Sequence, residues 1–383
     1  MICNRPRIVY WNNIPSPYMV DRFNALADRN SFDFEAWFND RIEPDRSWEV
    51  DENTWRFRYR YLPTFKIGGR RFHFPLTVFG RRPDVLVSLY AEPSFLAGWA
   101  IARLRGTKTA FWCEVTWDKL VQRRTWKEWL KRKVLPSAPI TIGAGEDGRA
   151  YAMRYGVPSH SALSLIHVID VEHFASGRRK AWEERELIRT QLGLKSTTFI
   201  YVGRLWWGKG INYLLEAFCE VQRRAAGEVS LLLVGDGPEE ICLRQICQER
   251  GIRNVVFAGF HQKPEMPRYY ATADVFVFPT LGDTYGLVVD EAMACSLPVI
   301  STSAVGEIRD RVEDGVNGYI VQPEDSAALT DRMLQLARDP DLRERMGKIS
   351  ADKIAGRTPE RWAEDFEQIV GSILNRETVM RSR

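Results

Sequence analysis

The sequence has few of the residues that build disulfide frameworks and metal sites. Its 383 residues include only six cysteines and five histidines. The cysteines are scattered, no two of them form a CxxC pair, and no histidine lies near them at metal-ligand spacing. We therefore expect reduced, buried cysteines rather than a disulfide scaffold or a zinc centre.

Long apolar runs are also missing. No stretch approaches the roughly 18 apolar residues that a membrane-spanning helix needs, and the first residues, MICNRPRIVYWNN, lack the apolar run of a secretory signal. The sequence therefore predicts a cytoplasmic protein, for which any membrane contact would be peripheral and at the inner face of the membrane.

The net charge of +4 conceals two halves of opposite sign. Residues 1–180 carry 29 Lys and Arg against 19 Asp and Glu, whereas residues 181–383 carry 25 against 31. A basic half and an acidic half suggest different partners for the two. Since no recognised DNA- or RNA-binding motif accompanies the basic residues, we expect no nucleic-acid partner.

A chain of this length exceeds what one hydrophobic core usually supports, so two domains are expected. From Thr197 onward, short apolar runs such as TTFIYVG, VSLLLVG and ADVFVFP alternate with amphipathic stretches such as INYLLEAFCEV. Such runs are typical of parallel strands that helices cover on both faces, and the first half repeats the theme more loosely. The sequence thus predicts an α/β protein made of two Rossmann-like, doubly wound domains.

The predicted domains are residues 1–176 and residues 177–358. The charged segment 177–189, GRRKAWEERELIR, is the expected linker region, part of it helical. The last segment, 359–383, has apolar residues at helical spacing, which predicts a closing amphipathic helix that packs back toward the N-terminal domain.

Two cations follow a predicted strand in YVGRLWWGKG, residues 201–210. Arg204 and Lys209 flank a short loop between that strand and the next helix. Cations at the carboxyl end of a parallel strand, beside a helix amino terminus, are suited to a diphosphate. The alternative is a strand–loop–helix unit with solvated charges.

A second segment, residues 279–302, places Asp283 before TYGL and Glu291 eight positions later. A helix that starts near Tyr285 would direct its N–H groups and the positive end of its dipole toward a ligand beside Asp283 and Gly286. N–H groups bind phosphate and carboxylates bind hydroxyls, so this segment fits a sugar diphosphate. The alternative is an acidic helix cap with Glu291 on the helix surface.

Together these segments resemble glycosyltransferase family 4, retaining enzymes of the two-domain GT-B fold. The motifs VGRL, KG, LLEAF, LLLVGDGP, VVFAGF, YYATADVFVFPT, the acidic-x7-Glu pair and EIRDRVEDGVNGYIVQPED occur in the family's order across residues 201–325. The resemblance implies two Rossmann-like domains that face a central cleft. It also implies transfer of a hexose-type sugar from a nucleoside-diphosphate sugar, with a UDP-sugar favoured, to an unidentified acceptor such as a glycan or a lipid-linked glycan.

The resemblance also assigns roles to single residues. Arg204 and Lys209 would neutralise the donor diphosphate, Glu291 would hold the ribose, and Asp283 would contact the transferred sugar. The donor would further lie against Gly203, Gly235, Phe260, Thr284, Tyr285, Gly286 and Leu287, with the N–H groups of the last three capping the distal phosphate. Asp283 and Thr284 replace the family's usual Glu and Gly. The donor sugar therefore stays open, and no cofactor is implied, because the nucleotide sugar is a substrate.

The first half of the chain matches the family less well. NNIPSPYMVDRF replaces the glycine-rich loop after the first strand, and no equivalent of the family histidine is evident in FWCEVTWD, where Glu114 is the nearest polar candidate. Pro17, Tyr18 and Glu114 are thus the acceptor-side candidates, although PSPY is equally typical of a proline-restricted turn into a helix. His167 stands where the family has Asn, and a structural role is favoured for it.

Two further patterns bear on cofactors and metals. GAGEDG, residues 143–148, satisfies the dinucleotide pattern GxGxxG but falls late in its domain rather than in the first strand-to-helix turn. Asp339 and Asp341 spell DxD, a metal-diphosphate signature of a different glycosyltransferase fold, but they follow a helical run and better mark a helix end and a new start. We expect no required metal.

A strongly basic stretch, KLVQRRTWKEWLKRKV at residues 119–134, carries seven Lys and Arg against one acidic residue, interleaved with Trp126 and Trp129. A basic amphipathic helix of this kind can lie on an anionic membrane surface. The favoured alternative is that its apolar stripe packs on its own domain and leaves a solvated basic face.

Two rival functions stay open from the sequence. One is another GT-B sugar-nucleotide enzyme such as an epimerase, which would consume donor without an acceptor. The other is a catalytically weak donor-binding protein, a reading that the Asp283 substitution makes conceivable.

Overall fold

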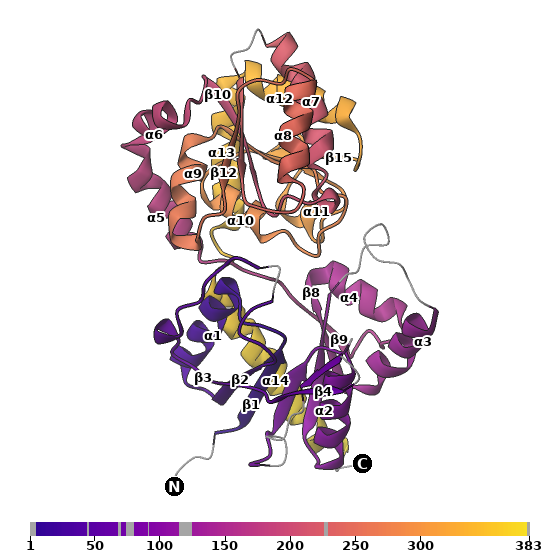
Figure 1. Ribbon diagram of the computed structural model, residues 1–383. Coiled ribbons are helices and arrows are strands. Elements are labelled where there is room, and N and C mark those ends of the chain that lie inside the picture. The colour runs from indigo at the N-terminus through magenta and orange to yellow at the C-terminus, as the bar shows by residue number, and fades with distance from the viewer. Residues whose placement is uncertain are drawn as a thin grey trace. The chain divides into compact units, whose positions relative to one another are not determined.

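The computed structural model describes residues 5–43, 46–67, 70–73, 80–90, 92–114, 125–225 and 229–380, which fold as two compact units (Figure 1). Unit 1 takes the described residues up to 114 together with 125–168 and 359–380. Unit 2 takes the described residues of 169–358. The predicted boundary after residue 176 therefore falls inside a helix of unit 2, eight residues beyond the observed division after Val168.

Unit 1 is built on a parallel sheet with the strand order β3-β2-β1-β6-β7-β8-β9. Its strands are β1 (Arg7–Asn12), β2 (Asp33–Phe38), β3 (Arg58–Tyr61), β6 (Val85–Ser88), β7 (Lys108–Cys113), β8 (Ile140–Ala144) and β9 (Ala162–Leu165), with a separate antiparallel hairpin of β4 (Thr64–Ile67) and β5 (Arg70–His73). Its helices are α1 (Pro17–Arg29), α2 (Pro93–Leu104), α3 (Thr125–Val134), α4 (Gly145–Arg154) and α14 (Pro359–Met380), with short 3-10 turns at η1 (Glu52–Thr54) and η3 (Leu135–Ser137).

Strand β1 shows why helices cover both faces of this sheet. Its side chains alternate, so that Ile8 and Tyr10 enter a core with residues of α1 and α14, whereas Val9 and Trp11 enter a second core with Phe95 of α2. All four of these residues of β1 are buried. A strand that is apolar on both faces in this way is typical of a doubly wound sheet.

The last helix, α14, belongs to unit 1 although it follows the whole of unit 2 in the sequence. The predicted helix is confirmed, and its apolar side chains Trp362, Phe366, Ile369, Val370 and Ile373 are buried in the core that β1 and α1 share. The rings of Trp362 and Phe366 stack with their centroids 5.0 Å apart.

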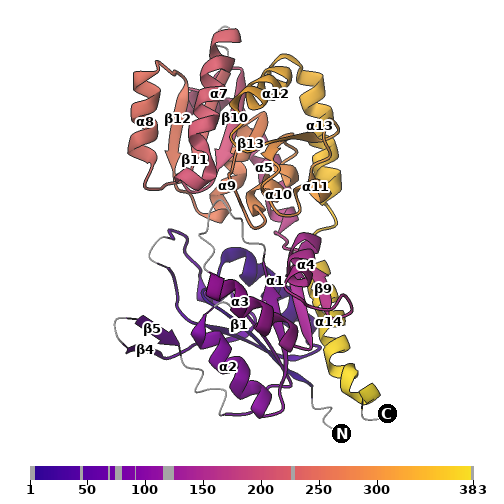
Figure 2. The same cartoon turned by 90° about the vertical axis from the view of Figure 1, so that its right-hand side faces the viewer.

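Unit 2 repeats the topology with the strand order β12-β11-β10-β13-β14-β15, all parallel (Figure 2). Its strands are β10 (Thr197–Val202), β11 (Val229–Val234), β12 (Val255–Gly259), β13 (Val275–Phe278), β14 (Val299–Thr302) and β15 (Gly318–Val321). Its helices are α5 (Val171–Trp182), α6 (Arg185–Leu192), α7 (Ile211–Arg224), α8 (Glu240–Glu249), α9 (Met266–Thr272), α10 (Leu287–Ala294), α11 (Ile308–Arg311), α12 (Ser326–Arg338) and α13 (Pro340–Ile354), with 3-10 turns η4 (Trp207–Lys209) and η5 (Lys263–Glu265). The predicted fold class is confirmed, because both strand orders reverse direction at the first strand as in Rossmann-like sheets.

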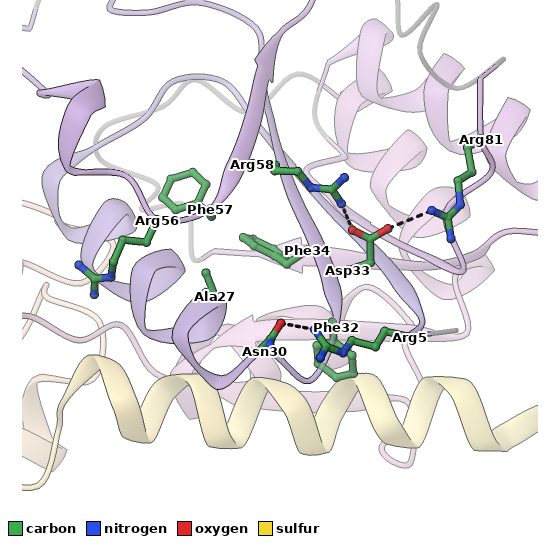
Figure 3. A pocket seen from close by; sticks show the side chains of 10 residues that line it. All are labelled: Arg5, Ala27, Asn30, Phe32, Asp33, Phe34, Arg56, Phe57, Arg58 and Arg81. Carbon is green, nitrogen blue, oxygen red and sulfur yellow. Dashed lines mark hydrogen bonds and ion pairs between the residues drawn. The ribbon is translucent and has the colours of Figure 1, made fainter. Parts of the chain in front are cut away.

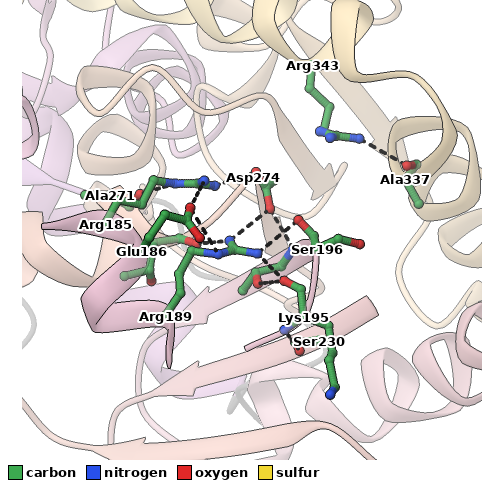
Figure 4. A network of polar contacts seen from close by, with 12 residues as sticks. Arg185, Glu186, Arg189, Lys195, Ser196, Ser230, Ala271, Asp274, Ala337 and Arg343 are labelled. Carbon is green, nitrogen blue, oxygen red and sulfur yellow. Dashed lines mark hydrogen bonds and ion pairs between the residues drawn. The ribbon is translucent and has the colours of Figure 1, made fainter. Parts of the chain in front are cut away.

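The segment 177–189, expected to be a linker region, is instead part of two helices that pack within unit 2 (Figure 4). Arg185 and Arg189 of α6 both reach the carboxylate of Asp274, at 2.7 Å and 3.4 Å, and Arg189 also donates to the carbonyl oxygen of Thr272 at 2.6 Å. Asp274 in turn accepts from the N–H of Thr198 at 2.7 Å. The charges that suggested a solvated linker therefore bind α6 to the amino ends of β10 and β13.

Among the described residues, no helix has the length and apolar composition to span a membrane, and no group of three or more His, Cys, Asp and Glu is arranged to hold a metal ion. Asp339, one of the two carboxylates of the DxD pattern, caps α13 by accepting from the N–H of Leu342 at 2.9 Å.

The packing of α14 makes a prediction about stability. Replacing Phe366 with Ala should lower the free energy of unfolding of unit 1 by about 3–5 kcal/mol, because the lost ring leaves a cavity between α14 and the sheet. Chemical denaturation measures the effect. The matched control Leu104→Ala alters an 88% exposed side chain of the same unit, and its effect should stay within about 0.5 kcal/mol. Equal effects of the two substitutions would contradict the assignment of α14 to the core of unit 1.

Candidate functional site

The candidate site lies where the strand order of unit 2 reverses. Strand β10 is paired with β11 on one side and with β13 on the other, and the chain leaves β10 and β13 in opposite directions. Loops that follow such a pair of strands form a crevice at the carboxyl edge of the sheet, which is where open α/β sheets bind ligands. Residues 203–210 follow β10 and residues 279–286 follow β13, so both predicted motifs reach this edge.

Hydrogen bonds join these loops to each other and to the loop after β14. The carbonyl oxygen of Gly208 accepts from the N–H of Leu281 at 2.9 Å. Asp283 donates its N–H to the carbonyl oxygen of Ala304 at 2.9 Å, and its own carbonyl oxygen accepts from the N–H of Gly306 at 3.0 Å. The three loops therefore hold one another in place, and the side chains that they carry are not independent surface charges.

A close approach of two loops explains the glycines that follow β10 and β11. Gly235 has a φ of +135°, and a Cβ atom there would lie 2.0 Å from the carbonyl oxygen of Gly203. No larger residue can occupy the position without moving the backbone. Because Gly203 and Gly235 carry no side chain, the backbone segments that follow β10 and β11 can lie close together at the edge of the site.

Lys209 and Asp283 form the charged centre of this edge. The Nζ atom of Lys209 donates to Oδ2 of Asp283, and it also lies over the ring of Phe278, 5.3 Å from the ring centre. Burial on its own would raise the pKa of Asp283, but the charge and hydrogen bond of Lys209 and the backbone N–H groups of Tyr285 and Gly286 outweigh it. The pKa therefore lies below its usual value, and Asp283 is an ionised carboxylate at neutral pH.

The start of α10 differs from the sequence prediction. The helix begins at Leu287, with Gly286 as its N-cap residue at a φ of +69°, and not near Tyr285. The N–H of Tyr285 donates to Oδ1 of Asp283 at 3.1 Å. Of the three backbone donors expected to face a ligand phosphate, the N–H groups of Tyr285 and Gly286 are thus directed at the Asp283 carboxylate, although Asp283 is not the cap of α10.

Arg311 of α11 supports the site, although the sequence motifs did not predict it as a site residue. Its guanidinium is fully buried and pairs with the carboxylate of Asp290 on α10 at 2.8 Å. It also donates to the carbonyl oxygens of Tyr285, Gly286 (3.1 Å) and Gly306 (2.7 Å), and it lies over the ring of Tyr285. Arg311 thereby joins the loop that presents Asp283 to the loop after β14. In the sequence, Arg311 is the second arginine of EIRDR, one of the motifs that carry the family resemblance.

Glu291 lies in the interior and not on the surface of α10, so the alternative of a surface glutamate is wrong. It is 1% exposed, and its Oε2 accepts from the phenol of Tyr270 on α9 at 2.7 Å. The partner could not be deduced from spacing, because Tyr270 lies 21 positions earlier in the chain.

The remaining predicted donor-side residues lie at the same edge. Arg204 follows Gly203 directly, is half-buried, and its carbonyl oxygen accepts from the phenol of Tyr201 at 3.0 Å. Phe260 follows β12, and Thr284 lies in the loop beside Asp283; both are half-buried. Apart from Glu291, which lies in the middle of α10, the donor-side residues predicted from the sequence are on loops or a helix start at the carboxyl edge of one sheet.

Unit 1 carries its own charged cluster at the carboxyl edge of its sheet. Glu114, directly after β7, accepts from the indole N–H of Trp112 at 2.9 Å, and its Oε1 lies 3.2 Å from Nε2 of His167. The other ring nitrogen of His167, Nδ1, lies 2.9 Å from the guanidinium of Arg22 on α1. A guanidinium can only donate, so Nδ1 accepts, and the proton of a neutral His167 is on Nε2 and is donated to Glu114.

This cluster keeps Glu114 ionised. Burial would raise the pKa of its carboxyl, but the hydrogen bond and charge of His167, the indole of Trp112 and the charge of Arg22 lower it further, so the pKa lies below its usual value.

Of the other acceptor-side candidates, Pro17 and Tyr18 form the first turn of α1, which Ser16 caps. The sequence identifies Glu114 and His167 as separate residues of interest. It does not predict that they are in contact or that Arg22 contacts His167.

A pocket of about 640 Å³ in unit 1 is a separate feature (Figure 3). It lies near the amino ends of β1, β2 and β3, where Asp33 pairs with Arg58 and with Arg81. Arg56 at its rim pairs with Asp28 at 2.7 Å. Because these arginines already have carboxylate partners and the pocket is at the opposite edge of the sheet from Glu114, we do not include it in the candidate site.

Parts of the chain are similar to known glycosyltransferases. Residues 196–339 match the family described as glycosyl transferases group 1. The chain is 31% identical over 226 residues to the alpha-D-kanosaminyltransferase of Streptomyces kanamyceticus, covering 58% of each chain. It is 30% identical over 262 residues to a GDP-mannose-dependent alpha-(1-6)-phosphatidylinositol monomannoside mannosyltransferase of Mycolicibacterium smegmatis, covering 66% of this chain and 63% of that one. Each of these relatives is thus matched over less than two-thirds of its length.

Solved structures match over nearly the whole chain. Anabaena HepE in complex with UDP superimposes with a TM-score of 0.76 at 15% identity, covering 96% of this chain and 100% of that one. Sucrose-phosphate synthase from Thermosynechococcus elongatus gives a TM-score of 0.73 at 20% identity, covering 96% and 99%. At these identities the likeness establishes the fold.

The chain thus has the GT-B fold, and part of it is similar to a family of glycosyltransferases. More particularly, unit 2 carries the domain of the glycosyl transferases group 1 over residues 196–339. The edge that holds Lys209 and Asp283 lies inside that domain.

The buried pair on α10 and α11 yields a prediction. Arg311→Met should lower the free energy of unfolding of unit 2 by about 3–5 kcal/mol, because it leaves the carboxylate of Asp290 buried without its charge partner. The double substitution Arg311→Met/Asp290→Leu should recover part of this loss, because it removes both buried charges. Urea denaturation of the two variants measures both values. A double variant no more stable than the single one would show that the lost carbonyl contacts, not the unpaired Asp290, dominate.

Proposed function

We propose that the chain is a retaining glycosyltransferase that moves a hexose-type sugar from a nucleoside-diphosphate sugar to a hydroxyl acceptor. The observation that carries the proposal is the pairing of Lys209 with Asp283 at the switch point of a glycosyl transferases group 1 domain. That pairing puts a cation, a carboxylate and the start of α10 together where open α/β sheets bind phosphate esters.

The proposed donor site uses the residues of this edge. The diphosphate would contact Arg204 and Lys209, and its distal phosphate would lie near the N–H groups of Tyr285, Gly286 and Leu287. Because Asp283 already bonds Lys209 and the N–H of Tyr285, the donor has to compete with an internal carboxylate for the same groups. We infer that Asp283 then turns to the hydroxyls of the sugar.

The nucleoside would lie against the neighbouring strand ends. Glu291 would bind the ribose hydroxyls. Its carboxylate is nearly buried and already accepts from Tyr270, so it would have to bind Tyr270 and the ligand at the same time. Gly203, Gly235 and Phe260 would line the same part of the site. A UDP-sugar is the donor that we favour, and the solved structures of Anabaena HepE with UDP and with UDP-glucose, which share the fold, support that choice.

The proposed reaction needs no base from the protein. The bond between the anomeric carbon and the phosphate oxygen breaks, and the acceptor oxygen bonds to the same face of that carbon. The acceptor proton passes to the leaving phosphate oxygen, so that the products are a glycoside and a nucleoside diphosphate. Arg204, Lys209 and the start of α10 stabilise the negative charge that develops on the leaving group.

The acceptor side is proposed to lie in unit 1, at Pro17, Tyr18 and Glu114. Since His167 donates to Glu114, that carboxylate is held in place and ionised, and it can accept a hydrogen bond from an acceptor hydroxyl. A glycan or a lipid-linked glycan is the proposed acceptor class, because both offer hydroxyl groups.

The leaving-group mechanism predicts the effect of removing each cation. Arg204→Ala and Lys209→Ala should each lower the rate of transfer by about 10²-fold or more, as expected for loss of one donor to a developing oxyanion. Release of nucleoside diphosphate from a panel of nucleotide sugars and acceptors measures the rate. Arg223→Ala, an exposed cation on α7, is the matched control and should leave the rate unchanged. Wild-type rates in both site variants would remove the proposed mechanism.

The same assay separates the rival functions. An epimerase converts the nucleotide sugar without releasing nucleoside diphosphate and without an acceptor. A binding protein raises its melting temperature with nucleotide sugar, because ligand stabilises the native state, but shows no turnover across the panel.

Metal removal provides an independent check. We predict that excess EDTA leaves the transfer rate essentially unchanged, because the charge of the leaving diphosphate would be balanced by Arg204 and Lys209. Parallel assays with EDTA, with EDTA and excess Mg²⁺, and with EDTA and excess Mn²⁺ measure this. Activity lost in EDTA and restored by either ion would contradict it.

A further inference from the structure

Unit 1 carries two basic surfaces, one on helix α3 and one around the pocket of Figure 3. Of the basic stretch in the sequence, residues 119–124 lie outside the described part of the chain, and the remainder forms α3. Lys131 of α3 donates to the phenol of Tyr151 at 2.8 Å, whereas Trp126 and Trp129 are 57% and 60% exposed. The expectation that the apolar stripe of α3 packs on its own domain is therefore wrong.

The second basic surface surrounds a pocket at the amino ends of β1, β2 and β3 (Figure 3). Phe32, Phe34, Phe57 and Ala27 give the pocket an apolar wall. Among the ten described residues that line it, Asp33 is the one carboxylate, and four are arginines: Arg5, Arg56, Arg58 and Arg81. Its volume of about 640 Å³ lies within the range of sites for small molecules, roughly 300–1,000 Å³.

The arginines of the pocket outnumber the carboxylates that pair with them in the described contacts. Arg58 and Arg81 both pair with the carboxylate of Asp33, which lies 3.3 Å from Nη1 of Arg81. Arg5 donates to the amide oxygen of Asn30, which carries no charge. One negative charge is therefore shared by two guanidinium groups, and a third has an uncharged partner.

The same imbalance continues along β2. Glu35 accepts from Arg7 at 2.6 Å and from Arg60 at 2.5 Å, so this carboxylate is also shared by two cations. The pKa of Arg58 lies below its usual value, because burial and the charges of its arginine neighbours, Arg7 foremost, disfavour its charged form. An anion placed beside Arg58 would relieve this repulsion, whereas a neutral molecule would not.

We propose that this pocket binds a small organic phosphate, with the phosphate group at Arg58 and Arg81 and an apolar part against the phenylalanine side chains. The planar guanidinium group donates two parallel hydrogen bonds to phosphate oxygens. A phosphate monoester carries a charge of about −1.5 to −2 at neutral pH, so it competes well with the single charge of Asp33 for the two arginines. The apolar wall favours an ester with an aromatic or aliphatic group over free phosphate, because its surface leaves water on binding.

This site does not rest on the proposed transfer reaction. Its residues lie at the amino edge of the sheet of unit 1, whereas Glu114 lies at the carboxyl edge and the donor-side residues belong to unit 2. Titration calorimetry of the intact protein with 1-naphthyl phosphate tests it, with inorganic phosphate and 1-naphthol as separate titrants. We expect 1-naphthyl phosphate to bind at least about tenfold more tightly than either titrant, since only it offers both the charge and the apolar surface.

Three variants test the roles of the charges. Arg58→Gln/Arg81→Gln should weaken binding of 1-naphthyl phosphate by about tenfold or more, because two charged donors are lost. Asp33→Asn should strengthen it by about two- to fivefold, because the competing carboxylate is removed while both arginines remain. Ala27→Glu should weaken it, because a carboxylate is added to the pocket wall with every arginine in place.

Two controls show where the ligand binds. Arg179→Gln/Arg244→Gln alters paired arginines of unit 2 whose side chains are 62% and 53% exposed, close to the 62% of Arg58. Arg204→Ala/Lys209→Ala removes the cations of the proposed donor site. Neither variant should change the affinity for 1-naphthyl phosphate, and circular dichroism and melting temperature verify that each variant folds.

Several outcomes would overturn the proposal. They are binding of 1-naphthyl phosphate no tighter than that of the two partial titrants, unchanged affinity in Arg58→Gln/Arg81→Gln, and affinity lost in the donor-site variant. A weaker affinity in Asp33→Asn would also overturn it, because it would show that the ion pairs of Asp33 serve the fold rather than compete with a ligand. Should the double arginine variant fail to fold, Asp33→Asn and Ala27→Glu decide, since both keep the arginines.

Discussion

The buried guanidinium of Arg311 is the interaction on which the candidate site depends. A charge removed from water destabilises the fold unless every donor finds a partner. Arg311 meets this requirement with one carboxylate, that of Asp290, and with carbonyl oxygens of the loops at 285–286 and 306. Those carbonyls cannot move without leaving a buried donor unpaired, so the backbone that presents Asp283 is fixed before any ligand arrives.

The Lys209–Asp283 pair gives this fixed loop its chemistry. Lys209 comes from the loop after β10 and Asp283 from the loop after β13, and each neutralises the other. Under the proposed function, a diphosphate brings more negative charge than Asp283 and so competes for Lys209 and for the N–H groups at the start of α10. Asp283 is one methylene shorter than glutamate and contacts Lys209 and the N–H of Tyr285 at once. Donor binding would therefore require this pair to rearrange.

The two units use one topology for different arrangements of charge. Unit 2 sets a lysine and backbone donors against a carboxylate. Unit 1 sets Glu114 against His167 and Arg22, which leaves an ionised acceptor of hydrogen bonds at the edge of its sheet. Helix α3 shows a third arrangement, in which its charged side packs within unit 1 and two of its aromatic side chains are exposed.

The sequence by itself determined the strand pattern, the two doubly wound sheets, the closing helix and the gathering of the donor-side motifs at one sheet edge. The reason is that periodicity and the alternation of strands with helices are local properties, and that parallel strands end together. It did not determine the contacts between distant positions: Arg311 with Asp290, Tyr270 with Glu291, and Arg22 with His167. It also misjudged α6, whose arginines bind Asp274, and α3, whose polar side is the packed one. Tertiary structure decided these cases, because the partner of a charged or aromatic side chain is set by which elements pack together, and a charge pattern looks the same whether it faces water or a buried partner.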